Sequence, residues 1–326
     1  MLTPSLAVLA GFALLVWSAD RFVIGAAATA RNLGVSPLVI GLTIVGFGTS
    51  APEMLISAIS AWEENPGVAV GNALGSNITN MGLVLGATAL VKPLTVHSGT
   101  LQREYPMMFI AMMLALILIM DGTLGAMDGV LLVAGLCLVM YWMARMGKAP
   151  PDGLDPMAAE FEAELPPPMT TARALMWLAI GLAILLLSSR MVVWGAVDIA
   201  RHFGVSDLII GLTVIAIGTS LPELAASVMS ALKGEHDIAI GNVIGSNIFN
   251  ILGVLGISGI IYPHAVDPEV LSRDFPVMIG LTIALFAMAY GFRRPGSLNR
   301  FEGTLLLTTY VGYLTLLGLT VTARPA

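Results

Sequence analysis

The stretch GVSPLVIGLTIVGFGTSAPE at residues 34–53 returns in the second half of the chain as GVSDLIIGLTVIAIGTSLPE at residues 204–223. Thirteen of the twenty positions are identical, at an offset of 170 residues. A second block, VGNALGSNITNMGLVLG at residues 70–86, pairs with IGNVIGSNIFNILGVLG at residues 240–256 at the same offset. Self-similarity at a constant offset is typical of a repeated structural unit. The sequence therefore predicts two copies of one unit.

Composition indicates a membrane protein whose main partner is the lipid bilayer. Of the 326 residues, 57% are hydrophobic and only 11% are charged, and the mean hydropathy is +0.89. Charged side chains are expensive in hydrocarbon, so most of this chain is suited to lie there. The net charge of −6 and the scattered basic residues argue against nucleic acid as a partner. No protein partner is implied, and the single cysteine, Cys137, excludes an intrachain disulfide.

The predicted fold is an all-α membrane protein with ten transmembrane helices. A spanning helix needs about 20 apolar residues. The apolar run at the N-terminus lacks a basic flank and continues into hydrophobic sequence, so it is interpreted as a retained first helix and not as a signal peptide. The ten expected spans are residues 5–27, 36–62, 67–90, 104–120, 124–144, 173–195, 206–232, 237–262, 274–292 and 300–322.

Each copy of the repeat then holds five spans. Because five is an odd number, the second copy enters the membrane from the opposite side, and the two five-helix repeats are inverted. Inverted repeats are typical of secondary transporters, whose substrate site lies at the midplane between the halves. We expect residues 1–144 to form the first repeat, residues 145–172 a cytoplasmic linker, and residues 173–326 the second repeat.

The linker between the repeats is acidic and rich in proline. We interpret it as a solvated spacer, because it is too short for a domain and lacks the spacing of a calcium-binding loop. A regulatory cation site there is the alternative. Its acidic residues are Asp152, Asp155, Glu160, Glu162 and Glu164.

The distribution of basic residues predicts the orientation in the membrane. With both termini outside, the inside-facing connectors hold eleven of the fifteen Lys and Arg residues, as the positive-inside rule requires. Arg21 and Arg190 weaken this count slightly, because they fall at membrane depth in the predicted spans.

Glu53 and Glu223 are the strongest candidates for functional residues, since each lies inside a long apolar segment. An intramembrane acid costs several kcal/mol unless it is paired, protonated or bound to an ion. Packing has no need to duplicate such an acid, whereas two carboxylates brought together by pseudo-symmetry would neutralise one divalent cation.

Hydroxyls and a proline precede each glutamate. Thr49 and Ser50 stand four and three residues before Glu53, so a helix would place all three on one face. Pro52 removes a backbone donor and frees the carbonyl of Gly48, so the helix is expected to kink and to expose carbonyl oxygens. Thr219, Ser220, Pro222 and Glu223 repeat the pattern.

The second block adds further oxygen ligands. Ser76 and Asn80 are i, i+4 neighbours on a helix, as are Ser246 and Asn250. Hard cations such as Ca²⁺ and Na⁺ prefer oxygen, and neither block has the Cys or His that a zinc site would use. For the other polar residues of the two blocks we favour a role in helix packing; they are Ser57, Ser60, Ser227, Ser230, Asn72, Asn77, Asn242 and Asn247.

At these blocks the chain resembles the prokaryotic type of the sodium/calcium exchanger family, within the cation/calcium antiporter superfamily. The patterns GTSxPE and GNxxGSNIxN of that family each occur twice here. The resemblance implies a transporter of the plasma (inner) membrane that carries Ca²⁺ and Na⁺, with no enzymatic activity and no cofactor. It also implies cation ligation by Glu53 and Glu223, by the backbone carbonyls of Thr49, Thr219, Gly46 and Ala216, and by Ser50, Ser220, Ser76 and Ser246.

One departure from the family pattern concerns Asn80 and Asn250, which are amides where some members carry Asp. The site then has only two acidic groups. This argues against potassium co-transport and leaves the number of sodium ions open.

Four other hypotheses remain at this point. A proton/calcium antiporter or an exchanger of another divalent cation would use the same two glutamates. An intramembrane enzyme would use them as an acid and base pair, and a channel would line a continuous pore with the same oxygens. Dependence of calcium transport on sodium separates the sodium/calcium antiporter from these four alternatives.

Overall fold

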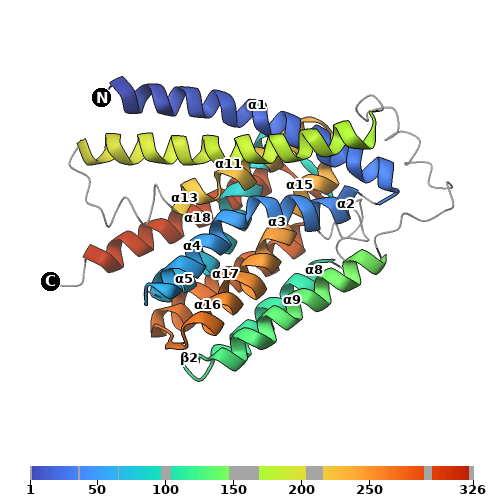
Figure 1. Ribbon diagram of the computed structural model, residues 1–326. Helices are drawn as coiled ribbons and strands as arrows, with labels where there is room; N and C mark the ends of the chain where they lie inside the picture. The colour runs from blue at the N-terminus through green and yellow to red at the C-terminus, as the bar shows by residue number, and fades with distance from the viewer. Residues whose placement is uncertain are drawn as a thin grey trace.

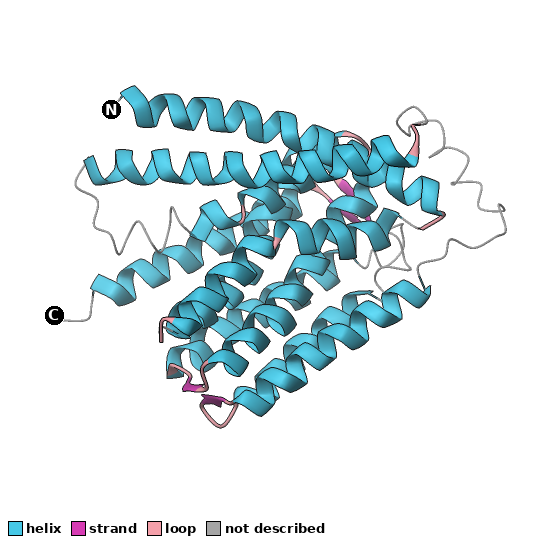
Figure 2. Ribbon diagram, viewed as in Figure 1, coloured by secondary structure: helices cyan, strands magenta, loops and turns pink. Residues whose placement is uncertain are grey.

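The protein is almost entirely helical, as the computed structural model shows (Figure 2). Two short antiparallel strand pairs, absent from the all-α prediction, tie connectors together: Leu94–Val96 (β1) with Gly296–Leu298 (β4), and Thr123–Leu124 (β2) with His264–Ala265 (β3). The structure describes residues 2–35, 37–64, 66–96, 104–146, 169–202, 216–289 and 296–322. The predicted acidic residues of the linker lie outside this part of the chain.

The described helices follow a similar order in the two halves. The first half contains α1 (Leu2–Leu33), α2 (Pro37–Ile40), η1 (Gly41–Val45), α3 (Gly46–Thr49), α4 (Ala51–Trp62), α5 (Pro66–Thr79), η2 (Asn80–Val84), α6 (Leu85–Val91), α8 (Glu104–Ile119) and α9 (Ala126–Met146). The second half contains α11 (Thr171–His202), α13 (Ala216–Thr219), α14 (Leu221–Leu232), α15 (His236–Ile248), η4 (Phe249–Val254), α16 (Leu255–Ile261), η5 (Val270–Asp274), α17 (Phe275–Ala289) and α18 (Arg300–Thr322).

The longest helices, α1 and α11, lie side by side along one edge of the molecule (Figure 1). They run antiparallel, because Pro4 lies beside Gly195 and Phe22 beside Gly181. A Cβ atom at Gly181 would stand 2.6 Å from the backbone nitrogen of Phe22, so the two backbones nearly touch. Both helices are longer than the predicted spans. In α1 the additional residues after position 27 include the small buried residues Ala28, Thr29 and Ala30.

The core of the bundle is shared between the halves. Ile78 of α5, Met112 of α8, Ile248 of α15 and Phe275 of α17 are all fully buried in one apolar cluster. The two halves are therefore not separate packing units. Residues from both of them exclude water from the same interior.

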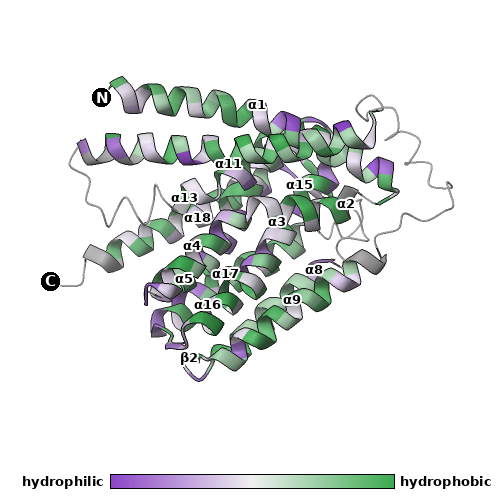
Figure 3. Ribbon diagram, viewed as in Figure 1, coloured by the Kyte–Doolittle hydropathy of each residue, from purple (hydrophilic) through white to green (hydrophobic). Residues whose placement is uncertain are grey.

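Many helices expose large hydrophobic side chains. Most of the helical ribbon is accordingly green, the colour of hydrophobic residues, in Figure 3. Within the described residues, six helices are long and apolar enough to cross a bilayer, and the bent pair over Gly41–Trp62 makes a seventh. The chain is thus a multi-pass membrane protein. The count of ten stays a prediction: α8 and α14 are apolar but shorter, and the predicted span 206–232 begins outside the described residues.

A charged contact joins α1 to the connector between α14 and α15. Lys233 Nζ lies 2.7 Å from Asp20 Oδ1, and the guanidinium of Arg21 stands 5.2 Å from the ring centre of Trp177 on α11. Asp20 and Arg21 of α1 are therefore both accommodated by neighbouring groups. Beside Lys233, Glu235 is only 9% exposed.

We expect the stability of the protein to depend on pH through Glu235. Burial, reinforced by repulsion from Asp237 and offset in part by Lys233, raises the pKa of Glu235 to about 7. The folded chain therefore holds a proton that the unfolded chain loses near pH 4.5. The free energy of unfolding should fall, by an amount of order 1–3 kcal/mol, as the pH rises through this interval, and level off above about pH 7.

Thermal unfolding of the detergent-solubilised protein across this pH range measures the effect. In Glu235→Gln, whose side chain at this position cannot titrate, the fall in the free energy of unfolding with pH should be smaller by about 1–3 kcal/mol. Equal declines in the wild type and the variant would show that the pKa of Glu235 is not raised.

Candidate functional site

Glu53 and Glu223 occupy equivalent places at the start of two buried helices. Each lies in the first turn of its helix, α4 or α14, with proline at the second position. Both residues are fully buried, and Ser50, three residues before Glu53, donates a hydrogen bond to the carboxylate of Glu223. The positive end of a helix dipole favours an acidic group in the first turn. The two halves thus bring both predicted carboxylates into one buried region.

A helix break precedes each glutamate by three residues. Ser50 leaves helical geometry at φ −84° and ψ 2°, and Ser220 does so at φ −89° and ψ 6°. The chain bends by 52° at Ser50. Pro52 and Pro222 explain the breaks, because a proline in the helix donates no hydrogen bond to the carbonyl four residues earlier. The kink predicted from the sequence is confirmed.

Hydroxyl groups connect the two halves at this break. Ser50 Oγ donates to Glu223 Oε1 over 3.2 Å, so the serine of one copy supports the glutamate of the other. Thr49 Oγ1 donates to Asn242 Oδ1 at 3.1 Å and lies 3.4 Å from Ser246 Oγ. Ser246 Oγ in turn donates to the carbonyl oxygen of Gly46 at 3.4 Å. Asn242 Nδ2 also donates to the carbonyl oxygen of Glu223, so these contacts place five of the predicted site residues in one network.

Several buried oxygens near these helices have no hydrogen-bond partner within the described part of the chain. Buried polar atoms are normally satisfied, and an unsatisfied carboxylate oxygen is especially costly. A cation is the natural partner for such a set, because every member can act as an electron-pair donor. The unpartnered oxygens are Glu53 Oε1 and Oε2, Glu223 Oε2, Ser220 Oγ, Asn77 Oδ1, Asn80 Oδ1 and Asn250 Oδ1.

The remaining predicted site residues lie on helices that directly precede or follow those of the two glutamates in the sequence. Ser76 is buried near the end of α5, and Thr219 is half-buried at the end of α13. Gly46 and Ala216 are the first residues of α3 and α13. Their backbone carbonyls are thus placed at equivalent points, one turn before the breaks.

Both halves match a known protein family. The family profile described as Sodium/calcium exchanger protein matches residues 4–145 and 173–319. The chain belongs to this family. Exchangers of the family are transporters, and the duplicated motifs of this chain fall within the matched segments.

Relatives and solved structures cover nearly the whole exchanger chain. CaxA of Alkalimonas amylolytica is 53% identical over 97% of this chain and 99% of its own length. The sodium/calcium exchanger MaX1 of Methanosarcina acetivorans is 30% identical over 96% and 97% of the two chains. A structure of the sodium-calcium exchanger NCX_Mj, soaked with Na⁺ and Sr²⁺, has a TM-score of 0.81 at 31% identity and covers 96% of this chain and 98% of that one.

Asn72 and Asn242 of this exchanger brace the two glutamates through the backbone. Asn72 Nδ2 donates to the carbonyl of Glu53 at 3.1 Å and to Ser57 Oγ at 3.0 Å. Asn242 makes the same two bonds to Glu223 and Ser227, at 3.2 and 2.8 Å. The packing role predicted for these asparagines is thus accompanied by a positioning role. Asn72 and Asn242, Glu53 and Glu223, and Ser57 and Ser227 are all separated by 170 residues. This shared offset was the sequence signal that could have indicated the positioning role.

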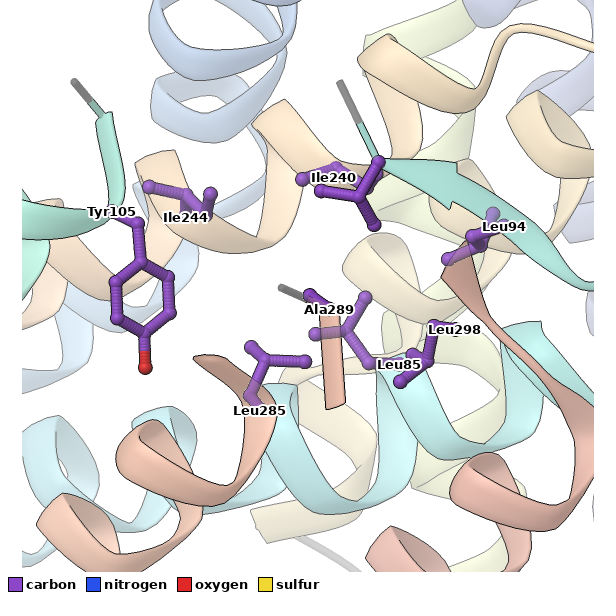
Figure 4. Close-up of a pocket in the computed structure, with 9 residues that line it drawn as sticks. Leu85, Leu94, Tyr105, Ile240, Ile244, Leu285, Ala289 and Leu298 are labelled. Carbon is purple, nitrogen blue, oxygen red and sulfur yellow. The ribbon is translucent and has the colours of Figure 1, made fainter. Parts of the chain in front are cut away.

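A separate apolar pocket lies between the halves (Figure 4). Leu85, Leu94, Leu285 and Leu298 are among its lining residues, Tyr105 is the one described lining residue with a polar side-chain atom, and the surface of the pocket is apolar. It contains none of the oxygen ligands predicted from the motifs. A cation would find no charge there, so this pocket is not the candidate transport site.

Proposed function

We propose that this protein is a secondary antiporter that exchanges Ca²⁺ for Na⁺ by alternating access. The observation that carries the proposal is the pair of buried glutamates, one from each half, of which Glu223 accepts a hydrogen bond from the Ser50 hydroxyl of the opposite half. Two carboxylates balance the charge of one Ca²⁺. Family membership and the likeness to NCX_Mj support the same substrate ions.

In this proposal the cation ligands are all oxygens, grouped around the two helix breaks. Glu53 and Glu223 supply the charge, and neutral oxygens complete the coordination of an ion that takes 6–8 ligands. The neutral ligands would be the hydroxyls of Ser50, Ser220, Ser76 and Ser246, the amide oxygens of Asn80 and Asn250, and the carbonyls of Thr49, Thr219, Gly46 and Ala216.

The proposed architecture is ten spans in two inverted five-helix repeats. The antiparallel packing of α1 against α11, which begin the two halves, supports this arrangement. Both termini would face outward from the inner membrane, with the acidic linker in the cytoplasm. Residues 1–144 and 173–326 would be the two repeats, and the segments that begin them, 5–27 and 173–195, would be the candidates for sliding in the alternating-access cycle.

Exchange follows from the cost of an empty site. With Ca²⁺ or Na⁺ bound, the carboxylates are neutralised and the bundle can close over its load. Without a cation, closure would trap two like charges in a dry interior, which costs several kcal/mol. Each return step therefore needs a counter-ion, and Ca²⁺ and Na⁺ compete for the same glutamates.

Uptake of ⁴⁵Ca²⁺ into proteoliposomes of the purified protein tests this function. We expect uptake with Na⁺ inside and none when choline replaces the internal Na⁺. Uptake driven by a proton gradient without Na⁺ would replace the proposal with the proton/calcium alternative. Flux of another divalent cation such as Mg²⁺, with no flux of Ca²⁺ under any gradient, would exclude calcium as the substrate.

A further inference from the structure

Two methionines outside the repeated motifs contact the asparagines behind the glutamates. Asn247 Nδ2 lies 3.6 Å from Met108 Sδ, and Asn77 Nδ2 lies 3.6 Å from Met278 Sδ. The two contacts are equivalent, since Met278 follows Met108 by 170 residues and Asn247 follows Asn77 by the same number. All four side chains are buried. A contact repeated in both halves is unexpected for methionines that only fill space.

The thioether decides which way the asparagine amide points. A thioether sulfur accepts hydrogen bonds weakly and cannot donate one, so the NH₂ group of Asn247 must face Met108. The oxygen of Asn247 then faces the other way, and it accepts a hydrogen bond from Asn80 Nδ2 at 3.2 Å. This bond in turn commits the NH₂ group of Asn80, leaving Asn80 Oδ1 buried and without a partner in the described part of the chain.

Asn80 begins η2, which packs against α14, the helix whose first turn carries Glu223. A π-helical turn inside an α-helix is frequent at functional sites. If the amide of Asn80 were reversed, it would offer NH₂ hydrogens to a cation where it now offers an oxygen. The orientation of this amide therefore matters for cation affinity.

We propose that Met108 and Asn247 are positioning residues that hold Asn80 with its oxygen toward the transported cation. The inference rests on the proposed cation site, and it adds an orienting relay, Met108 to Asn247 to Asn80, that lies outside the GTSxPE motifs. The equivalent relay of the other half is incomplete. The NH₂ group of Asn77 contacts Met278 and also donates to the backbone carbonyl of Asn247 at 3.3 Å, but neither Asn77 Oδ1 nor the amide of Asn250 has a partner within the described residues. The two copies of the motif are thus held differently in this conformation.

Met108→Leu tests the relay, because leucine keeps the volume of methionine but has no acceptor, and such swaps usually preserve the fold. We expect the KM for Ca²⁺ of Na⁺-driven ⁴⁵Ca²⁺ uptake to rise about fivefold, with a smaller change in the maximal rate. Met143→Leu is the matched control, since Met143 is also buried in the shared core. Its KM should stay at the wild-type value.

A double-mutant cycle separates positioning from packing. In an Asn80→Ala background, Met108→Leu should leave KM nearly unchanged, because the residue through which it acts is gone. A fivefold effect that persists there, or a Met108→Leu protein that matches Met143→Leu, would overturn the relay while leaving the exchanger function intact.

A second double-mutant cycle measures stability and does not depend on transport. It remains usable if the wild type carries no Ca²⁺, a result that would contradict the proposed function but not the contact between Met108 and Asn247. The unfolding temperature of the solubilised protein should change non-additively for Met108→Leu with Asn247→Ala. It should change additively for Met143→Leu with Asn247→Ala. Additive behaviour of the first pair would overturn the relay.

Discussion

Replacing either glutamate with glutamine, Glu53→Gln or Glu223→Gln, is expected to abolish Na⁺-driven Ca²⁺ uptake. Glutamine keeps the size of the side chain, and in Glu223→Gln it still accepts the hydrogen bond from Ser50. Pro52 and Pro222 are unchanged, so the helix breaks are preserved. It removes one of the two negative charges that face the cation. Losing one partner of a buried charge pair costs about 3–5 kcal/mol, which corresponds to at least ~100-fold in affinity.

The measurement is initial ⁴⁵Ca²⁺ uptake into Na⁺-loaded proteoliposomes with equal amounts of each variant. Glu63→Gln is the matched control, because Glu63 follows the same helix, α4, but is exposed. Its uptake should equal that of the wild type. Retention of more than a tenth of wild-type uptake by both buried variants would mean that the transported cation does not depend on these carboxylates.

Adding one methyl group at Gly245 is expected to destabilise the protein severely. A Cβ atom there would lie 2.3 Å from the carbonyl oxygen of Leu42 and 2.8 Å from its carbonyl carbon. These are backbone atoms of η1, so no side-chain rotation can relieve the clash. Overpacking of this kind typically costs about 1–3 kcal/mol, and a rigid backbone neighbour places Gly245→Ala at or above the upper end.

Thermal unfolding and the yield of monodisperse protein measure this effect. Gly280→Ala in α17 is the control, because Gly280 is exposed and no described heavy atom lies within 4 Å of the added Cβ. Alanine also favours a helix over glycine by about 0.5–1 kcal/mol, so this variant should be as stable as the wild type or more so. Equal stability of Gly245→Ala and Gly280→Ala would show that α15 and η1 are not in close backbone contact.

Much of the fold was predictable because the duplication constrains it. The helical class, the membrane environment and the break ahead of each glutamate all followed from periodic apolar runs and from Pro52 and Pro222. The family profile then matched both halves. The strand pairs β1 with β4 and β2 with β3 were not predicted, because two or three residues in a connector carry too weak a pattern.

The candidate site was predictable in its residue types but not in its connections. An acid inside an apolar helix is conspicuous at any position, which is why Glu53 and Glu223 stood out. The hydrogen bond from Ser50 to the glutamate of the opposite half had no local signal, because it joins residues 173 positions apart. The same holds for Met108 and Asn247, which lie 139 positions apart.

Sequence alone was enough to establish that this chain is a duplicated membrane protein with two buried acids, since hydropathy and repetition can be counted along the chain. From the sequence, the two copies of the motif are expected to be equivalent. In the folded chain they are not: Asn80 is tied to Asn247, whereas Asn250 has no partner among the described residues. Such a difference depends on how the two halves pack against each other, because contacts between residues far apart in the sequence form only in the folded chain.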